Sequence, residues 1–153
     1  MMTVKLEQIV EADRAIVELM MLRGLPGRVQ FRVACFIETM RTILKQWADV
    51  RTAKMNELGT IPLLDKDGKE LPGQFEVAPE KKEEFLKFQH DALDEDIQLD
   101  LKEVVLPEKN DLTLQSLSYL LKFGVTVDEI PAPVVPAAPP ESPKILPFNR
   151  PVK

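Results

Sequence analysis

The fold is decided by the stretch from Arg28 to Leu58, RVQFRVACFIETMRTILKQWADVRTAKMNEL. Its large apolar residues recur at alternating steps of four and three positions: Val29, Val33, Phe36, Met40, Ile43, Trp47 and Val50. This heptad spacing places them on one face and predicts a single long helix with a packed seam. At a rise of about 1.5 Å per residue, some thirty residues extend over about 45 Å, which is longer than the core of a small domain. We therefore expect the far end, after Lys54, to be solvated, and Gly59 to end the helix.

A second helix is predicted on the N-terminal side of this stretch, from about Val4 to Arg23. Its apolar residues follow the helical period: Leu6, Ile9, Val10, Ile16, Val17, Met20 and Met21. The segment Leu25-Pro26-Gly27 then ends the helix, because proline and glycine interrupt helical hydrogen bonding. This corner is short enough to return the long helix alongside the first. The sequence therefore predicts an antiparallel helical hairpin.

Residues 60–78, which follow the long helix, have the composition of a small β-ribbon. Their apolar stretches are punctuated by two turn signals, Asp67-Gly68 and Pro72-Gly73. Pro79, followed by acidic residues, then opens a third helix that ends near Asp94, because proline suits a first helical position and acids favour helix N-termini. The buried stripe of this helix is expected to contain Phe85, Phe88, Ala92 and Leu93.

The last predicted elements are a strand and a short helix. Apolar and polar residues alternate over 97–105, which is typical of a half-buried strand, and we expect this strand to join the β-ribbon. Thr113 has the side chain of a helix N-cap, and Gly124 ends the helix after it. The apolar residues of that helix are Leu114, Leu117, Leu120 and Leu121. The fold class is therefore mainly α, of the α+β type, with residues 1–130 as a helical interaction domain.

Charge divides the 153 residues into an acidic body, residues 1–130, and a weakly basic arm, residues 131–153. The body holds 17 basic and 24 acidic side chains, a net charge of −7, whereas the arm has a net charge of +2. An acidic body repels phosphate backbones, so we expect it to bind no nucleic acid. No apolar run approaches the roughly eighteen residues of a membrane-spanning helix, so we expect no membrane partner.

Two acidic segments have a superficial resemblance to metal sites. The loop Asp65-Lys66-Asp67-Gly68 looks like the start of a calcium loop, but Lys69 stands where a ligand is needed, and we expect an ordinary β-turn. The cluster Asp94-Glu95-Asp96 with Asp100 has oxygen ligands for a hard cation. Because acids at a helix C-terminus are slightly unfavourable, we expect these residues to form a solvated helix end instead.

The single histidine and the single cysteine are expected to have no catalytic role. A catalytic His90 would have to be oriented by a third group beside a nucleophile, and we expect it at or near the surface. Cys35 is expected on an apolar helix face as a small hydrophobic residue, and Trp47 in the core. No nucleotide-binding, zinc or nucleophile motif is present. We therefore expect no catalytic residue, no cofactor and no metal, and a protein that is not an enzyme.

The arm, residues 131–153, holds eight of the thirteen prolines of the chain. Proline fixes φ and lacks a backbone N–H, so this composition predicts an extended, polyproline-II-like segment. Near its end it carries three large apolar side chains, which a simple spacer does not need, because exposed apolar clusters favour association. We therefore expect a docking peptide with Ile145, Leu146 and Phe148 as anchors and Arg150 as a polar clamp.

The order of elements carries a family resemblance: the Leu25-Pro26 corner, the long helix with an aromatic seam, the ribbon with Asp67-Gly68 and Pro72-Gly73-Gln74-Phe75, the helix start Pro79-Glu80, the strand Asp96-Ile97…Leu101 and the helix Leu112-Thr113…Leu117. Over residues 4–123, without the arm, this order resembles small uncharacterised proteins encoded by tailed bacteriophages and prophages. The resemblance implies a phage setting and a non-enzymatic role, and it carries no catalytic residues.

Body and arm together predict a phage virion or virion-assembly protein. The helical body is expected to pack against one neighbour while the arm docks on another, the partners being virion subunits or further copies of the chain. Its location would be the virion, or the host cytoplasm during assembly. Two alternatives stay open: a soluble phage effector that binds and inhibits a host protein, with the acidic body as a nucleic-acid mimic, and an enzyme with scattered carboxylates.

Overall fold

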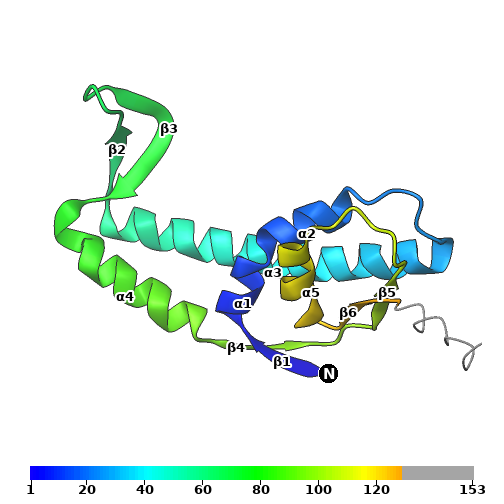
Figure 1. Cartoon of the computed structure of the whole chain (residues 1–153). Coiled ribbons are helices and arrows are strands. Elements are labelled where there is room, and N and C mark those ends of the chain that lie inside the picture. Colours follow the sequence, from blue (N-terminus) through cyan, green and yellow to red (C-terminus); the bar gives the residue numbers. More distant parts are fainter. Residues whose placement is uncertain (129–153) are drawn as a thin grey trace, which may run out of the picture.

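The computed structural model describes residues 1–128, and the predictions for the arm, including Ile145, Leu146, Phe148 and Arg150, fall on residues outside this part. The elements, shown in Figure 1, are β1 (Met2–Lys5), α1 (Leu6–Glu11), α2 (Asp13–Met20), α3 (Gly27–Leu58), β2 (Thr60–Leu64), β3 (Glu70–Val77), the 3₁₀ turn η1 (Pro79–Lys81), α4 (Lys82–Leu93), β4 (Asp96–Leu99), β5 (Val104–Leu106), α5 (Leu114–Leu121) and β6 (Val125–Val127). Residues 1–128 thus contain five α-helices and three two-stranded sheets, which confirms an α+β fold.

The long helix α3 begins and ends close to the predicted residues. Pro26 stands at its N-cap, and the helix continues without interruption to Leu58. Gly59 follows with a φ of 90°, a conformation that only glycine adopts without strain. The glycine therefore ends the helix and directs the chain into β2.

The heptad seam of α3 is buried over only half of its length. The buried residues of α3 are Val33, Phe36 and Met40, all in its first half. Further along, Ile43 and Trp47 are half-buried, and Val50 is 51% exposed. The predictions that Trp47 is a core residue and that the seam continues to Val50 are therefore wrong. The heptad pattern identified the helix correctly, but solvation begins well before Lys54 because no element covers this part of the seam completely.

The N-terminal segment is not the single helix predicted from Val4 to Arg23. Residues 2–5 form β1, which pairs antiparallel with β4 so that Val4 lies opposite Ile97. The helical part begins only at Leu6 and is divided at Ala12 into α1 and α2. Pairing with a strand more than ninety positions away in sequence leaves no trace in the local period, so the helical pattern alone placed the start too early.

The strand predicted over 97–105 does not join the β-ribbon. The ribbon consists of β2 and β3, which pair antiparallel with Thr60 opposite Val77. The predicted strand is instead divided into β4, which pairs with β1, and β5, which pairs in parallel with the unpredicted strand β6. The ribbon lies at the far end of α3, away from β4 and β5 (Figure 1). The prediction is wrong because alternation identifies a strand but not its partner.

Two shorter helices are confirmed near their predicted positions. Pro79 begins η1, and α4 continues from it to Leu93, although Phe85 is the one buried residue of α4. Thr113 is the N-cap of α5, where its Oγ1 accepts a hydrogen bond from the Ser116 N–H at 3.2 Å. This bond satisfies one of the donors that the first turn of a helix leaves unpaired.

The hydrophobic core lies between α1, α2, the first half of α3 and the segment from β4 to β6. Its buried members are Val4, Ile9, Ala12, Ala15, Ile16, Leu19, Val33, Phe36, Met40, Leu99, Val104, Leu106, Leu112, Leu120, Phe123 and Val125. In this core the Phe36 and Phe123 rings meet edge to face with centroids 6.4 Å apart. No residue from 45 to 96 belongs to the cluster. In residues 1–128 no helix is both long and apolar enough to span a membrane.

Candidate protein interaction surface

Residues 46–94, which we call the distal lobe, comprise the far part of α3, the β2–β3 ribbon, η1 and α4. Figure 1 shows the lobe projecting from the body that holds the core. Within the lobe, Val77 and Phe85 are the only buried apolar residues. Burying one such side chain stabilises a fold by about 1.5–3 kcal/mol, whereas fixing the backbone of each residue costs about 1–2 kcal/mol. The distal lobe therefore has too small a core to be stable by itself.

Aromatic rings and cations hold the two helices of the distal lobe together. The Trp47 indole of α3 stacks on the Phe88 ring of α4, with centroids 6.4 Å apart and planes inclined by 18°. Phe85 extends this stack, with its centroid 6.5 Å from that of Phe88. Two cations of α3 lie over the phenyl rings: Lys54 Nζ is 5.5 Å from the Phe88 centroid, and Arg51 Cζ is 5.7 Å from the Phe85 centroid. The contacts position α4 without burying it.

Two large apolar side chains of the distal lobe flank one hollow and face solvent. Phe75 of β3 is 57% exposed and Leu86 of α4 is 62% exposed. The hollow between them, which we call the lobe hollow, has a volume of about 240 Å³ and is also lined by Met55, Val77 and Phe85. Isolated exposed apolar residues are normal on a monomer, but several around one hollow are typical of an interaction site.

The rim of the lobe hollow is charged. Arg51, Glu76 and Lys82 line it together with the apolar residues, and Lys82 Nζ lies 3.6 Å from Glu76 Oε2. An apolar floor with a polar rim is the usual composition of a protein–protein interface. The exposed side chains of Val50, Ile61 and Leu64 add apolar area elsewhere on the lobe. The lobe hollow is therefore suited to the apolar side chain of a protein partner.

The tip of the β2–β3 ribbon is a turn that Asp65 organises. Its Oδ1 accepts hydrogen bonds from the N–H groups of Asp67 at 2.8 Å and Lys69 at 2.9 Å. An oxygen that a calcium loop would direct at the ion is thus bonded to the backbone, and the turn interpretation is confirmed. The second turn signal, Pro72-Gly73, lies inside β3 rather than at a turn.

The acidic cluster at the end of α4 is partly neutralised by Lys5. The Lys5 Nζ lies 2.9 Å from Asp96 Oδ1 and 3.3 Å from Asp94 Oδ1, and it donates to the Asp94 carbonyl oxygen at 2.8 Å. The hydrogen bonds that Lys5 donates to Asp96 and then to Asp94 raise the pKa of Lys5 above its ordinary value. The cluster therefore joins β1 to the end of α4, a contact that the prediction of a solvated helix end did not include.

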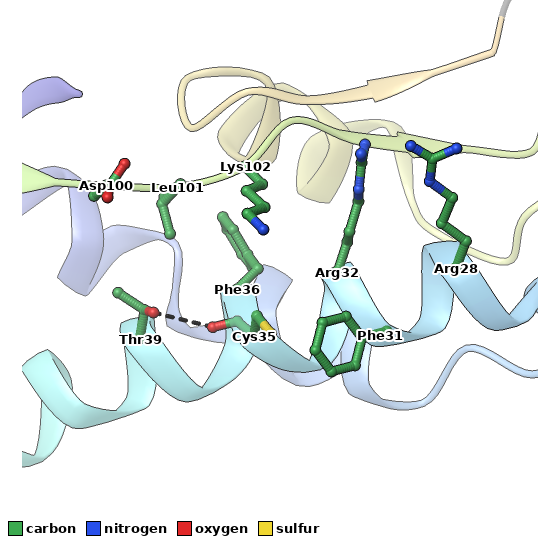
Figure 2. A pocket seen from close by; sticks show the side chains of 9 residues that line it. All are labelled: Arg28, Phe31, Arg32, Cys35, Phe36, Thr39, Asp100, Leu101 and Lys102. Atoms are coloured by element: carbon green, nitrogen blue, oxygen red, sulfur yellow. Dashed lines mark hydrogen bonds between the residues drawn. The ribbon is translucent and has the colours of Figure 1, made fainter.

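A more basic cavity lies on the body, between the first half of α3 and residues 100–102, and has a volume of about 550 Å³. Figure 2 shows Arg28 and Arg32 extending from α3 toward the neighbouring extended segment, with Lys102 reaching back toward α3. Arg32 Nη1 donates to the Glu103 carbonyl oxygen at 3.0 Å. Two guanidinium groups and an ammonium group favour an anionic ligand, but Asp100 on the same rim offsets part of their charge.

Cys35 lies on the wall of this basic cavity and is exposed, so the prediction of a small hydrophobic residue on an apolar face is wrong. Because Phe36 directs its ring into the core, the preceding residue falls about 100° away around the helix and leaves the core face. His90 is exposed in the last turn of α4, as expected, and does not line the cavity. The structure therefore does not bring the two residues together in one site.

Sequence reasoning did not single out Phe75 and Leu86, the exposed residues of the lobe hollow. A signal was present for Leu86, because it lies beside the predicted stripe of α4 rather than on it. Phe75 gave no such signal, since alternation in a ribbon does not reveal where along a face the covering ends: Val77 is buried and Phe75 is exposed.

The function of the chain has to be argued from these surfaces. In residues 1–128 no group of His, Cys, Asp and Glu side chains has the arrangement of a metal site. Comparison of the chain with protein-family models, with curated proteins and with solved structures finds no match.

Proposed function

We propose that this chain is a non-enzymatic virion or virion-assembly protein of a bacteriophage. It packs through its helical body, binds a neighbouring protein with the distal lobe, and docks the arm, residues 131–153, on another subunit. The phage setting is inferred from the resemblance in the order of elements. The binding role is inferred from the surface of the lobe, and it requires no chemistry of the chain's own.

The observation that carries this proposal is the contrast between the length of the distal lobe and its core. Residues 46–94 contribute nothing to the core cluster, yet Phe75 and Leu86 each expose more than half of their surface. Covering apolar surface stabilises by about 25 cal/mol per Å² removed from water. A partner that binds only the folded lobe stabilises it further by mass action. We therefore expect a partner to cover the exposed apolar side chains of the distal lobe and to stabilise it.

The shape of the chain also favours an assembly role. The 32 residues of α3 extend over about 48 Å at about 1.5 Å per residue, so one end lies in the core while the other carries the ribbon. A subunit of this shape contacts a neighbour at a distance from its own body. Such a subunit gains contact area from its projection rather than from a large core.

Quantitative mass spectrometry of purified particles tests this proposal. We expect the chain in particles of the phage that encodes it, at a fixed copy number relative to the major capsid protein. We also expect its arm to resist added protease in particles and to be cut in the free chain. Absence from particles, together with a complex of defined stoichiometry with one host protein, would instead support the soluble effector.

A further inference from the structure

A second apolar surface lies on the body, where α5 meets β6. Leu114, Leu117 and Leu121 are three and then four positions apart, so they form a stripe along one side of α5. Leu114 is 85% exposed and Leu121 is 55% exposed. Together with Ser118, Thr126 and Val127 they line a groove of about 530 Å³, which we call the α5 groove.

An adjacent side of α5 already faces the core, and Leu117 at the edge of the stripe also packs against it. Leu120 is fully buried there, and Phe123 follows it into the same cluster. A helix whose apolar surface extends beyond the side that faces its own core is typical of a helix covered by more than one element. The surface of Leu114 and Leu121 therefore has the composition of a covered surface, although residues 1–128 leave more than half of each side chain exposed.

The backbone of β6 adds an edge beside this stripe. Its neighbours Gly124 and Asp128 bond to β5: the Val104 N–H donates to the Gly124 carbonyl at 3.3 Å, and the Asp128 N–H donates to the Leu106 carbonyl at 2.6 Å. Alternate residues of a parallel strand direct their backbone groups to opposite sides, so Val127 directs its groups away from β5. In residues 1–128 no further strand pairs with β6. Apolar pockets beside a strand edge are a known arrangement for binding extended peptides.

We propose that the α5 groove binds the segment Ile145-Leu146-Pro147-Phe148 of a second copy of this chain. The inference rests on the proposed docking role of the arm and names its acceptor. Three large apolar side chains within four residues match a groove lined by three leucines and a valine. Charge supports the pairing, because the arm has a net charge of +2 whereas residues 1–130 have a net charge of −7. The acidic Asp128 is exposed directly beside Val127 of the groove.

The position of the groove favours a second copy over the same copy. The described part of the chain ends directly beside the groove, and residues 129–144 separate this point from Ile145. At about 3.1 Å per residue, such a proline-rich segment reaches up to about 50 Å when extended. Six prolines in residues 131–143 fix φ and oppose the reversal that a return to the same groove requires. The groove of a neighbouring copy needs no such reversal.

Photocrosslinking of the full chain tests this inference. Phe148 is replaced by p-benzoylphenylalanine, copies labelled with ¹⁵N are mixed with unlabelled copies, and the crosslinked peptides are identified by mass spectrometry. We expect crosslinks to residues 114–127 that join a labelled to an unlabelled copy. Crosslinks within one copy, crosslinks to other parts of the body, or no crosslinks at all would overturn the inference.

A variant of the groove provides the second arm of the experiment. Leu114→Glu with Leu121→Glu changes two exposed positions, so the melting temperature is expected to stay close to that of the wild type. We expect self-association in sedimentation experiments to weaken about tenfold or more, because bound apolar side chains would then meet carboxylates. The matched control, Gln115→Glu with Lys122→Gln, adds the same negative charge to α5 outside the groove and is expected to self-associate normally.

The two proposals fail in different ways. If the groove variant self-associates and crosslinks as the wild type does, the α5 groove is not the acceptor, whereas the chain can still be a component of particles. If the chain is absent from particles but the groove variant loses self-association, the groove is the acceptor and the virion role is wrong.

Discussion

Thr113 donates two hydrogen bonds to Glu18 Oε2, from its N–H at 3.3 Å and from its hydroxyl at 3.1 Å. The contact joins the start of α5 to α2 across 95 positions of sequence, and it therefore holds the helix of the α5 groove on the body. Hydrogen bonding by Ser116, and then by the backbone and side chain of Thr113, lowers the pKa of Glu18 below its ordinary value.

Glu18 is therefore expected to stabilise the fold in a pH-dependent way. A carboxylate whose pKa is lowered on folding stabilises above the unfolded pKa, here an ordinary value of 4.5, and this contribution is lost as the pH falls through the folded pKa. The difference in melting temperature between wild type and Glu18→Gln should be larger near about pH 7 than near about pH 3. Thermal melts at the two pH values measure it, and an equal difference at both would show that the ionised carboxylate is not the stabilising form.

The stack of Trp47 on Phe88 should stabilise the distal lobe and not the body. We expect Trp47→Ala or Phe88→Ala to lower the free energy of local opening in residues 46–94 by about 1–3 kcal/mol. Native-state hydrogen exchange measures this, with Thr52→Ala as a control at an exposed position of α3. Equal acceleration of exchange in core strands such as β4 would contradict a separate distal lobe.

The two halves of α3 should respond differently to truncation of their seam residues. Phe36 is buried in the core, so Phe36→Ala is expected to destabilise the fold by about 3–5 kcal/mol. Val50 occupies the same seam but is exposed, so Val50→Ala is expected to change stability by less than about 0.5 kcal/mol. Denaturant unfolding of both variants tests the pair, and similar losses would mean that the seam is covered along its whole length.

Neither calcium nor His90 should matter for stability. Asp65 Oδ1 accepts hydrogen bonds from the backbone, and Lys5 lies beside both Asp94 and Asp96, so these three carboxylates already have partners. We expect the melting temperature to be unchanged by calcium, by a chelator and by His90→Ala. A melting temperature that rises with calcium concentration would reveal a site on these carboxylates, because a ligand of the folded state stabilises it.

Local signals predicted most of the helices because each of their ends has a chemical cause in the sequence. Gly59 ends α3, Pro79 opens η1 and Thr113 caps α5, and all three residues act within a few positions of themselves. The heptad spacing of α3 likewise needed no knowledge of its partners.

Long-range pairing was not predictable in the same way. The pairing of Val4 with Ile97 and the parallel pairing of β5 with β6 depend on segments that are distant in sequence or very short. The exposure of individual side chains was also not predictable. Val50 and Phe36 occupy equivalent seam positions, yet only Phe36 is covered. The candidate surface could not be predicted in full for this reason. Phe75 differs from a core residue only in what fails to cover it, whereas the position of Leu86 beside the predicted stripe of α4 was a usable signal.

Incorporation of a lobe variant into purified phage particles tests binding by the distal lobe most directly. Phe75→Asp with Leu86→Asp places two carboxylates at the lobe hollow. Gln74→Asp with Thr52→Asp adds the same charge at exposed positions of the lobe that do not line the hollow. We predict that the first pair lowers the copy number about tenfold or more, because desolvating an unpaired carboxylate at an apolar contact is costly, and that the control incorporates as the wild type does. Equal copy numbers for the two pairs would contradict binding through the lobe hollow.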